Sequence, residues 1–166
     1  MEHLWTPWRS TYVTGKTLAR ECVFCGALRS GNDKDNLILH HAAHNFVLLN
    51  RFPYTSGHLM IAPNRHASRL SELEESAADE MWRLARSVEL IFAEIYQPDG
   101  VNIGMNLGEA AGAGIADHLH LHILPRWNGD ANFMTVIGGT RVMPESLEDT
   151  FAKLQAAFAD LGNATG

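Results

Sequence analysis

The segment from Asp117 to Trp127, D-H-L-H-L-H-I-L-P-R-W, constrains the fold of this chain more than any other stretch. It alternates strictly, with three histidines at one parity and three aliphatic residues at the other. Because successive side chains of a strand point to opposite faces of a sheet, the segment predicts a strand with one imidazole face and one aliphatic face. Such a strand fits a sheet that packs on a hydrophobic layer and turns its other face toward a functional cleft.

The three histidines are His118, His120 and His122. Neighbouring ones are separated by two strand rises, about 6.7 Å, so all three are able to serve one small anionic group or one metal ion. A merely solvated polar face is the alternative. It is disfavoured because a surface strand gains nothing from repeating the one side chain that titrates near neutrality.

Composition bounds the class of protein. The 166 residues have the length of one domain, and 46% hydrophobic residues with 19% charged residues are ordinary for a globular protein. The net charge of −6 argues against a broad nucleic-acid or anionic-membrane surface, because basic patches hold those partners. No basic, apolar leader and no membrane-spanning run is visible, so we expect a cytoplasmic protein.

Two hairpins are predicted around the histidine segment. The apolar runs at residues 45–50 and 58–62 are joined by R-F-P-Y-T-S-G, whose proline and glycine suit a loop between antiparallel strands. Residues 101–106 alternate between apolar and polar side chains, and a glycine-rich loop leads from them into the histidine segment. These segments supply most of an antiparallel sheet.

Two helices complete the predicted elements. Apolar residues recur at spacings of three and four over residues 72–97, which predicts a long helix that covers the aliphatic face of the sheet. Ser71 and Glu74 have the spacing of a capping box at its start. A second helix is expected to begin near Pro144 and to end at Gly162.

The histidine segment is compatible with three kinds of chemistry. Imidazoles chelate metals, a neutral imidazole attacks phosphorus without a separate base, and a polar strand face needs no function. In the preceding loop, Gly108, Gly112 and Gly114 let backbone N–H groups approach a phosphate closely. Next to three imidazoles, this loop favours phosphate chemistry over a catalytic metal.

Cys22 and Cys25 form a C-x-x-C pair, which in a reducing compartment is typical of a zinc half-site or a thiol redox pair. A thioredoxin-like pair opens a helix, whereas this pair is expected in an irregular arm before the turn-rich stretch G-A-L-R-S-G-N-D-K-D-N. Structural zinc is therefore favoured, with no organic cofactor. Zinc needs two further ligands, and spacing leaves these candidates open: His40, His41, His44, His58, His66 and His118.

The motif H-L-H-L-H-I-L resembles the H-x-H-x-H-x-x signature, with x hydrophobic, of the histidine triad (HIT) superfamily of nucleotide hydrolases and transferases. The resemblance extends through N-F-V-L-L-N-R, G-H-L-M-I-A-P-N-R-H and the following helix. The flanking L-W-T-P-W-R, G-V-N-I-G-M-N-L-G and P-R-W-N-G-D-A-N-F-M-T-V-I-G-G resemble the bacterial branch that includes diadenosine tetraphosphate phosphorylases.

The resemblance implies one HIT-like domain, with an arm at residues 1–21, a core at 22–127 and a C-terminal extension at 128–166. In the arm, Trp5 and Trp8 are expected to cover an exposed edge of the core, or else to make dimer contacts or stack on a ligand, and the first interpretation is about as favoured as the others. The expected fold is α+β, with an antiparallel sheet of about five strands, one long helix packed on it and a C-terminal helix. A homodimer or a higher homo-oligomer is implied as well.

The resemblance also implies roles for individual residues. The middle histidine of the triad, His120, is the nucleophile that forms a nucleotidyl-histidine, and His122 assists departure of the leaving group. His58 is the family's fourth histidine. Asn50 stands where the family holds the ribose hydroxyls, and Asn106 stands where phosphate contacts are made. The resemblance implies the same phosphate contacts for the loop that follows Asn106, which includes Gly112 and Gly114.

In zinc-containing relatives the metal is held by the C-x-x-C pair, the histidine that ends the P-x-x-H turn and the first triad histidine. The resemblance therefore implies zinc at Cys22, Cys25, His66 and His118, a closed tetrahedral set. The chain also departs from the family pattern. Many members carry Ser, Thr or Gln in the loop before the triad, where this chain has A-G-A-G-I, so Asn106, backbone or water would have to contact the scissile bridge.

The expected activity is cleavage of dinucleoside polyphosphates, with diadenosine tetraphosphate as the favoured substrate. His120 would attack the α-phosphorus, and water or inorganic phosphate would release the nucleotide. Two alternatives stay open: a nucleoside phosphoramidase that uses the same histidine, and a non-catalytic, zinc-stabilised nucleotide-binding protein.

Overall fold

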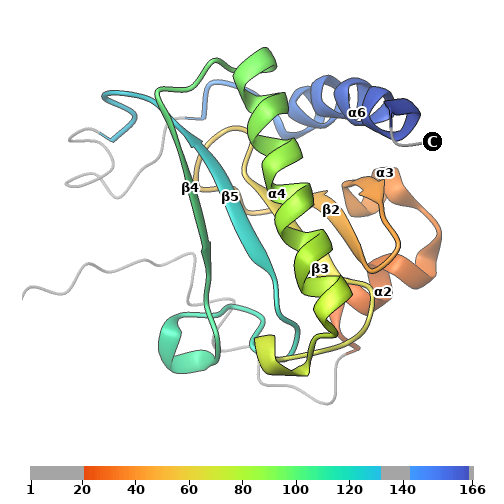
Figure 1. Ribbon diagram of the computed structural model, residues 1–166. Coiled ribbons are helices and arrows are strands. Elements are labelled where there is room, and N and C mark those ends of the chain that lie inside the picture. The colour runs from red at the N-terminus through yellow and green to blue at the C-terminus, as the bar shows by residue number, and fades with distance from the viewer. Residues whose placement is uncertain (1–20, 132–142, 165–166) are drawn as a thin grey trace, which may run out of the picture.

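Five antiparallel strands form one sheet in the spatial order β1-β2-β3-β5-β4 (Figure 1). The computed structural model describes residues 21–131 and 143–164. The predicted roles of Trp5 and Trp8 fall outside these residues. The strands are β1 (Ile38–His41), β2 (Asn45–Leu49), β3 (Leu59–Pro63), β4 (Gly100–Met105) and β5 (Leu121–Arg126). The α+β fold class and the strand number predicted from the sequence are confirmed.

Both predicted hairpins are present in the sheet. Strand β2 pairs with β3, with Val47 opposite Ile61, and β4 pairs with β5, with Ile103 opposite Ile123. The two hairpins join where β3 pairs with β5, so the histidine strand lies inside the sheet instead of at its edge. The sequence reasoning did not locate β1, whose four residues, I-L-H-H, are too few to show a period.

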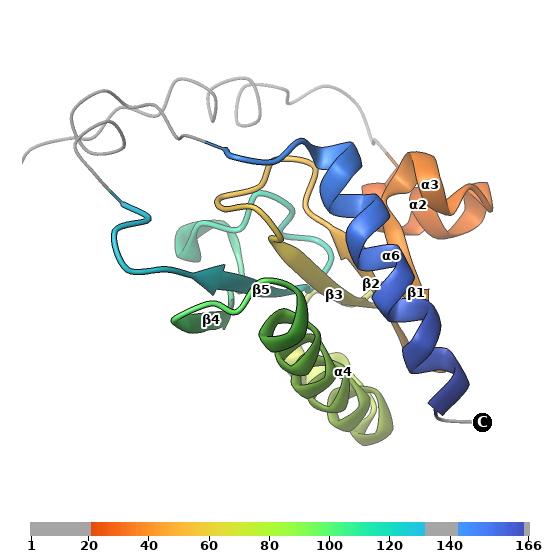
Figure 2. The ribbon, with the colours of Figure 1, turned by 90° about the horizontal axis from the view of Figure 1, so that it is seen from above.

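One face of the sheet packs against two helices, α4 (Glu75–Ile95) and α6 (Leu147–Ala164) (Figure 2). Their apolar faces meet the inward side chains of β2, β3 and β5 in one core. Its buried residues include Leu49, Leu59, Ile61, Met81, Val88, Phe92, Leu121, Ile123, Phe151, Leu154 and Phe158. Among the described residues, neither these helices nor any other is long and apolar enough to cross a membrane.

The opposite face is only partly covered. Helix α2 (Val23–Ser30) packs Phe24 and Ala27 against the outward side chains of the first three strands. Strands β2 and β3 are consequently buried on both faces, whereas β5 alternates between buried and half-buried residues. The imidazole side of β5 therefore stays partly open beside the exposed Gly104 of β4.

Helix α2 corrects two predictions. The stretch after C-V-F-C was expected to be a turn-rich loop, but it forms α2 and the short helix α3 (Asp33–Asn36). Cys22 is the N-cap of α2 and Cys25 lies in its first turn, so the predicted irregular arm is wrong at this point. Burial of Phe24 and Ala27 stabilises the helix despite its internal glycine, and Gly31, with φ +64°, ends it.

The ends of the two long helices also differ from the prediction. Helix α4 starts at Glu75, after a 3₁₀ turn at Leu70–Glu72, and the expected capping box of Ser71 and Glu74 is wrong because Ser71 lies inside that turn. Helix α6 runs through Gly162 to Ala164, so the predicted stop is wrong as well.

A carboxylate ties α4 to the turn between β1 and β2. Glu80 accepts hydrogen bonds from the backbone amide of His44 at 2.8 Å and from the side-chain amide of the buried Asn45 at 2.8 Å. Burial alone would raise the pKa of Glu80, but these hydrogen bonds outweigh it and the net pKa is lowered. The contact therefore favours the ionised carboxylate.

Replacing Glu80 with Ala should lower the free energy of unfolding by about 1–3 kcal/mol at neutral pH. The backbone amide of His44 and the side-chain amide of Asn45 would then lose their hydrogen-bond acceptor. Since the pKa of Glu80 is lowered by folding, this difference should shrink as pH falls below about 4.5, the ordinary pKa of glutamate. Urea unfolding of both proteins at several pH values measures it. Glu89→Ala, at an exposed position of the same helix, is the matched control. Equal losses in the two variants would contradict the prediction.

Candidate active site

The triad histidines span the start of β5. His118 and His120 precede the strand and are buried, whereas His122 lies within it, opposite Met60 of β3 and Gly104 of β4. The backbone amide of Leu119 donates to the carbonyl of Ala67 at 2.7 Å and holds the approach to the strand. Neighbouring histidines thus meet different surroundings, although the alternating pattern makes them look equivalent.

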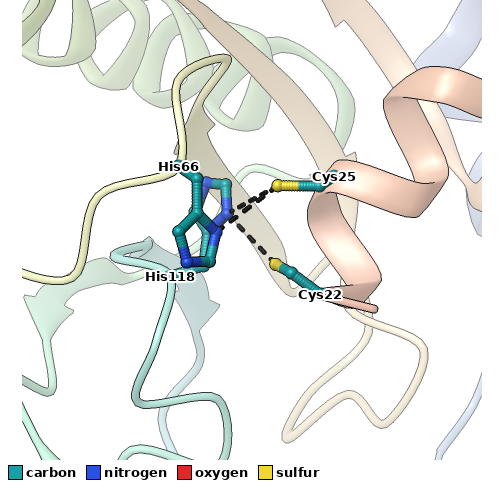
Figure 3. A group of neighbouring side chains, drawn as sticks. All are labelled: Cys22, Cys25, His66 and His118. Carbon is teal, nitrogen blue, oxygen red and sulfur yellow. Dashed lines mark hydrogen bonds between the residues drawn. The ribbon is translucent and has the colours of Figure 1, made fainter. Parts of the chain in front are cut away.

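His118 faces the two cysteines (Figure 3). Its Nδ1 lies 3.2 Å from Cys22 Sγ and 3.6 Å from Cys25 Sγ, and Cys25 Sγ lies 3.4 Å from His66 Nδ1. One ligand atom from each of these four residues lies within 4.8 Å of the others. A tetrahedral ion with bonds of about 2.0–2.3 Å places its ligand atoms about 3.5 Å apart, so the set has the dimensions of a metal site.

The tautomer of His118 suits a metal ligand. Its Nε2 lies 2.9 Å from the carbonyl oxygen of Pro63, and because a carbonyl only accepts, Nε2 carries the proton. The lone pair is therefore on Nδ1, the atom beside the sulfurs. A ring whose other nitrogen donates to a backbone carbonyl is the usual arrangement for a histidine that binds a metal.

His120 has the reverse arrangement of proton and lone pair. Its Nδ1 lies 2.9 Å from the carbonyl oxygen of His118, so Nδ1 carries the proton and the lone pair is on Nε2. Burial lowers the pKa of His120 and keeps the ring neutral near pH 7. The ring of Phe24 lies 5.1 Å from that of His120 and contributes to this burial. A neutral imidazole with a fixed lone pair is a nucleophile.

A second chain of hydrogen bonds fixes the proton of His122. The backbone amide of Tyr54 donates to His58 Nδ1 at 3.1 Å, so His58 Nε2 carries the proton and donates to His122 Nδ1 at 2.9 Å. His122 then carries its own proton on Nε2. Burial, reinforced by His120, lowers the pKa of His122 to about 4. The neutral ring is able to donate one hydrogen bond through Nε2.

Two neighbouring rings therefore offer complementary functions. His120 and His122, with ring centroids 4.7 Å apart, present a lone pair and a proton donor, respectively. An electrophile between them would meet a nucleophile on one side and a hydrogen-bond donor for a developing negative charge on the other. Attack on phosphorus with departure of an oxygen leaving group requires both functions.

The other predicted residues fall into two groups. Asn50 lies next to His58, with its amide nitrogen 3.4 Å from His58 Nδ1 and its oxygen accepting from the Phe52 amide. Asn106 and Gly112 lie in the loop between β4 and the triad, where Gly112 has φ +89°. Gly114 lies in the same loop, and the phosphate contacts assigned to these three residues stay predictions.

Sequence reasoning missed two aromatic residues of this region. Phe24 lies inside the C-x-x-C motif and contacts both buried triad rings. Tyr54 lies over His58, with centroids 4.7 Å apart, and supplies the amide that fixes its tautomer. The only signal for Tyr54 is its place four residues before His58 in the hairpin connector. Spacing alone cannot show that a backbone amide meets a ring nitrogen.

The fold and the site define a class of protein. A family model described as "HIT domain" matches residues 31–129, and the chain therefore belongs to the HIT domain family. The AP-4-A phosphorylase of Mycobacterium tuberculosis is 34% identical over 166 residues, which cover 96% of this chain and 85% of that protein. The bis(5'-adenosyl)-triphosphatase of Dictyostelium discoideum is 29% identical over 82 residues, 49% of this chain and 54% of that enzyme.

A solved structure is similar to this chain over most of its length. The crystal structure of a Zn-bound histidine triad family protein from Mycobacterium smegmatis is 28% identical and has a TM-score of 0.69. The match covers 87% of this chain and 97% of that chain.

The lowered pKa of His122 predicts a dependence of stability on pH. The unfolded chain binds the proton near pH 6.5 but the folded protein only near pH 4, so His122 should destabilise the fold as pH falls through this range. In His122→Asn this contribution is absent, and the melting temperature should fall less steeply from pH 7 to pH 4. Differential scanning calorimetry measures it, with His41→Asn, an exposed histidine, as control. Parallel curves for wild type and His122→Asn would contradict the assignment.

Proposed function

We propose that this protein cleaves dinucleoside polyphosphates, with diadenosine tetraphosphate as the favoured substrate, through a nucleotidyl-histidine intermediate on His120. The observation that carries the proposal is the pair of complementary tautomers, with a lone pair on His120 Nε2 and a proton on His122 Nε2. The name of the Mycobacterium tuberculosis relative, AP-4-A phosphorylase, supports the substrate class. The triphosphatase name of the Dictyostelium discoideum relative points to the same class.

In the first step, His120 Nε2 attacks the α-phosphorus of the substrate. A P–N bond forms, and the bond to the bridging oxygen breaks as that oxygen leaves with the remaining phosphates. His122 Nε2–H donates a hydrogen bond to the leaving oxygen as negative charge develops on it. His58 keeps this proton on the correct nitrogen. With diadenosine tetraphosphate, the leaving group is ATP and AMP stays on His120.

In the second step, an oxygen of inorganic phosphate or of water attacks the same phosphorus and the P–N bond breaks. Phosphate gives ADP, and water gives AMP with release of one proton to solvent. His120 recovers its lone pair without an external base, because its proton stays on Nδ1, bonded to the His118 carbonyl. Asn50 would hold the ribose hydroxyls, and the loop with Asn106, Gly112 and Gly114 would hold phosphate oxygens.

A structural zinc ion completes the proposal. Cys22, Cys25, His66 and His118 would hold it as a closed set that leaves no position for substrate. Bound there, the ion would join the first turn of α2 to the segment that carries the nucleophile. The Zn-bound relative from Mycobacterium smegmatis supports the choice of metal. A cytoplasmic location and a homodimer or higher homo-oligomer also stay part of this proposal.

The products formed from diadenosine tetraphosphate test the reaction. Incubation with phosphate should give ATP and ADP in equal amounts, separated by ion-exchange chromatography. Formation of ADP in place of AMP should require phosphate, since only phosphate adds a second phosphoryl group to the AMP on His120. ATP with AMP irrespective of phosphate would mean hydrolysis. Two ADP, or no turnover, would contradict attack at the α-phosphorus.

Replacing His120 with Ala should abolish the chemistry without abolishing the fold. Turnover should fall by about 10⁴-fold or more, because the nucleophile is lost and water has no base to replace it. Covalent labelling with a radioactive α-phosphate, trapped by rapid denaturation, should disappear as well. His41→Ala, at an exposed histidine bonded to Asp33, should keep both properties. Labelling retained by His120→Ala would contradict the assignment of the nucleophile.

Metal analysis tests the zinc site. Wild-type protein purified without chelator should contain about one zinc ion per chain, and Cys22→Ser should lose most of it together with thermal stability, because structural zinc contributes folding energy. His44→Ala is the control, since His44 lies next to β2 and was a candidate ligand by spacing. Zinc-free wild-type protein, or equal loss of zinc in His44→Ala, would contradict the assignment.

A further inference from the structure

The turn that precedes His58 is clamped from two sides. Gly57 has φ +77°, and a Cβ at this position would lie 3.0 Å from Tyr96 Cε2 and 3.2 Å from Pro125 Cγ. The glycine is thus required both by its backbone angle and by the close approach of two rings. The hydroxyl of Thr55 also donates to the carbonyl of Pro125 at 3.3 Å. The turn is therefore fixed against the end of α4 and against β5.

This turn carries the group that sets the proton positions of the active site. The amide of His58 donates to the carbonyl of Thr55 at 3.2 Å, which closes the turn. The amide of Tyr54, at its start, donates to His58 Nδ1 at 3.1 Å. A shift of the turn would move the Tyr54 amide away from the ring and weaken the preference for one tautomer of His58, because only the longer contact from the Asn50 amide, at 3.4 Å, would remain at Nδ1.

The two tautomers of His58 impose opposite protonation on His122. When His58 Nε2 carries the proton, it donates to His122 Nδ1 and leaves the His122 proton on Nε2. When His58 Nδ1 carries the proton, His58 Nε2 accepts instead, and His122 must place its proton on Nδ1. His122 then has no donor for the leaving oxygen. The pair behaves as a two-state switch, and the Tyr54 amide selects the active state.

Tyr96 is itself held in place by the segment before α6. Its hydroxyl donates to Glu145 at 3.0 Å, Thr150 donates to the same carboxylate oxygen at 2.8 Å, and Lys153 pairs with that carboxylate. Burial, with the neighbouring Glu145, raises the pKa of Tyr96 and keeps its hydroxyl protonated. Figure 2 shows the chain that leads into α6 passing the loop between β2 and β3. These anchors lie outside residues 31–129, which the family model matches.

We propose that Tyr96 is a positioning residue: its ring holds the turn at Gly57, so that the Tyr54 amide keeps the His58–His122 pair in the tautomer that donates from His122 Nε2. The kinetic consequence rests on the proposed function, whereas the tautomers exist without substrate. Tyr96 is not a catalytic residue, because it acts through the turn and through His58. The segment before α6 thereby contributes to the chemistry of the triad.

Tyr96→Leu tests the role of the ring, with Tyr96→Phe as the conservative variant that keeps it. Phe158→Leu is the matched control, since it removes a buried aromatic ring from α6 at a residue that stacks on His40. Long-range ¹H–¹⁵N correlation spectra of the substrate-free proteins report which nitrogen of His58 and of His122 carries the proton. Steady-state kinetics with diadenosine tetraphosphate give kcat and KM separately.

We expect Tyr96→Leu to populate both tautomers of the pair and to lower kcat in proportion to the lost fraction of the donating tautomer, about twofold for an equal mixture, with little change in KM. Tyr96→Phe should restore the single tautomer and most of kcat, and Phe158→Leu should keep both. If Tyr96→Leu does not fold, Gly57→Ala perturbs the same contact from the other side and should give the same mixture of tautomers.

Two results would overturn the positioning role. One is a single, wild-type tautomer in Tyr96→Leu, or in Gly57→Ala if that variant is needed. The other is that Phe158→Leu shows the same mixture of tautomers as Tyr96→Leu when the two variants lose a similar amount of melting temperature. The mixture would then result from general destabilisation of the fold. Failure of the wild-type protein to cleave the substrate would instead refute the proposed function, and the spectra would still decide the role of Tyr96.

Discussion

The hydrogen bond from His120 Nδ1 to the carbonyl of His118 is the interaction on which the site depends. It fixes the tautomer of one ring through the backbone of the residue whose own ring faces the two cysteines. A single backbone unit therefore links the candidate metal cluster to the candidate nucleophile. Since the ring of His118 is also bonded to the carbonyl of Pro63, the unit is held from β3 as well. Any movement of this segment would change both sites together.

The arrangement of layers explains why this interaction is protected. Helices α4 and α6 cover one face of the sheet and bury Leu121 and Ile123 against it. Burial of these two residues fixes the register of β5, and the register places the side chain of His122 on the opposite face. On the other face, α2 brings Phe24 against the rings of His118 and His120 but leaves β4 exposed. The candidate nucleophile, His120, is consequently only 4% exposed, whereas His122 is half-buried on the face beside the exposed β4. A further helix on this face would have buried His122 as well.

The sequence predicted the parts of this architecture that depend on period. Alternation predicted β5 and its two faces, although the strand begins at Leu121 and holds only one of the three histidines, and the recurrence of apolar residues at three and four predicted α4. Prediction from the sequence failed where a few tertiary contacts outweigh the local sequence pattern. In α2, two buried residues stabilise a helix in a stretch rich in turn formers, and the four residues of β1 are too few to show a period. Spacing left two members of the cysteine cluster open, because His66 and His118 meet the cysteines only through the fold. The tautomers were beyond prediction for the same reason, since backbone groups remote in sequence set them.

The source of the pKa shifts explains how two imidazoles are able to play opposite parts. For both His120 and His122 the largest cause of the lowered pKa is burial. A carboxylate partner would raise the pKa of either ring and favour the cation, which has no lone pair to attack phosphorus. Burial keeps both rings neutral, and only a neutral imidazole has one donor and one acceptor. The backbone then decides which nitrogen is which: the carbonyl of His118 takes the proton of one ring, and the amide of Tyr54, through His58, directs the proton of the other. Chemical asymmetry between identical side chains therefore comes from main-chain hydrogen bonds, and it depends on how firmly the fold holds those two peptide groups.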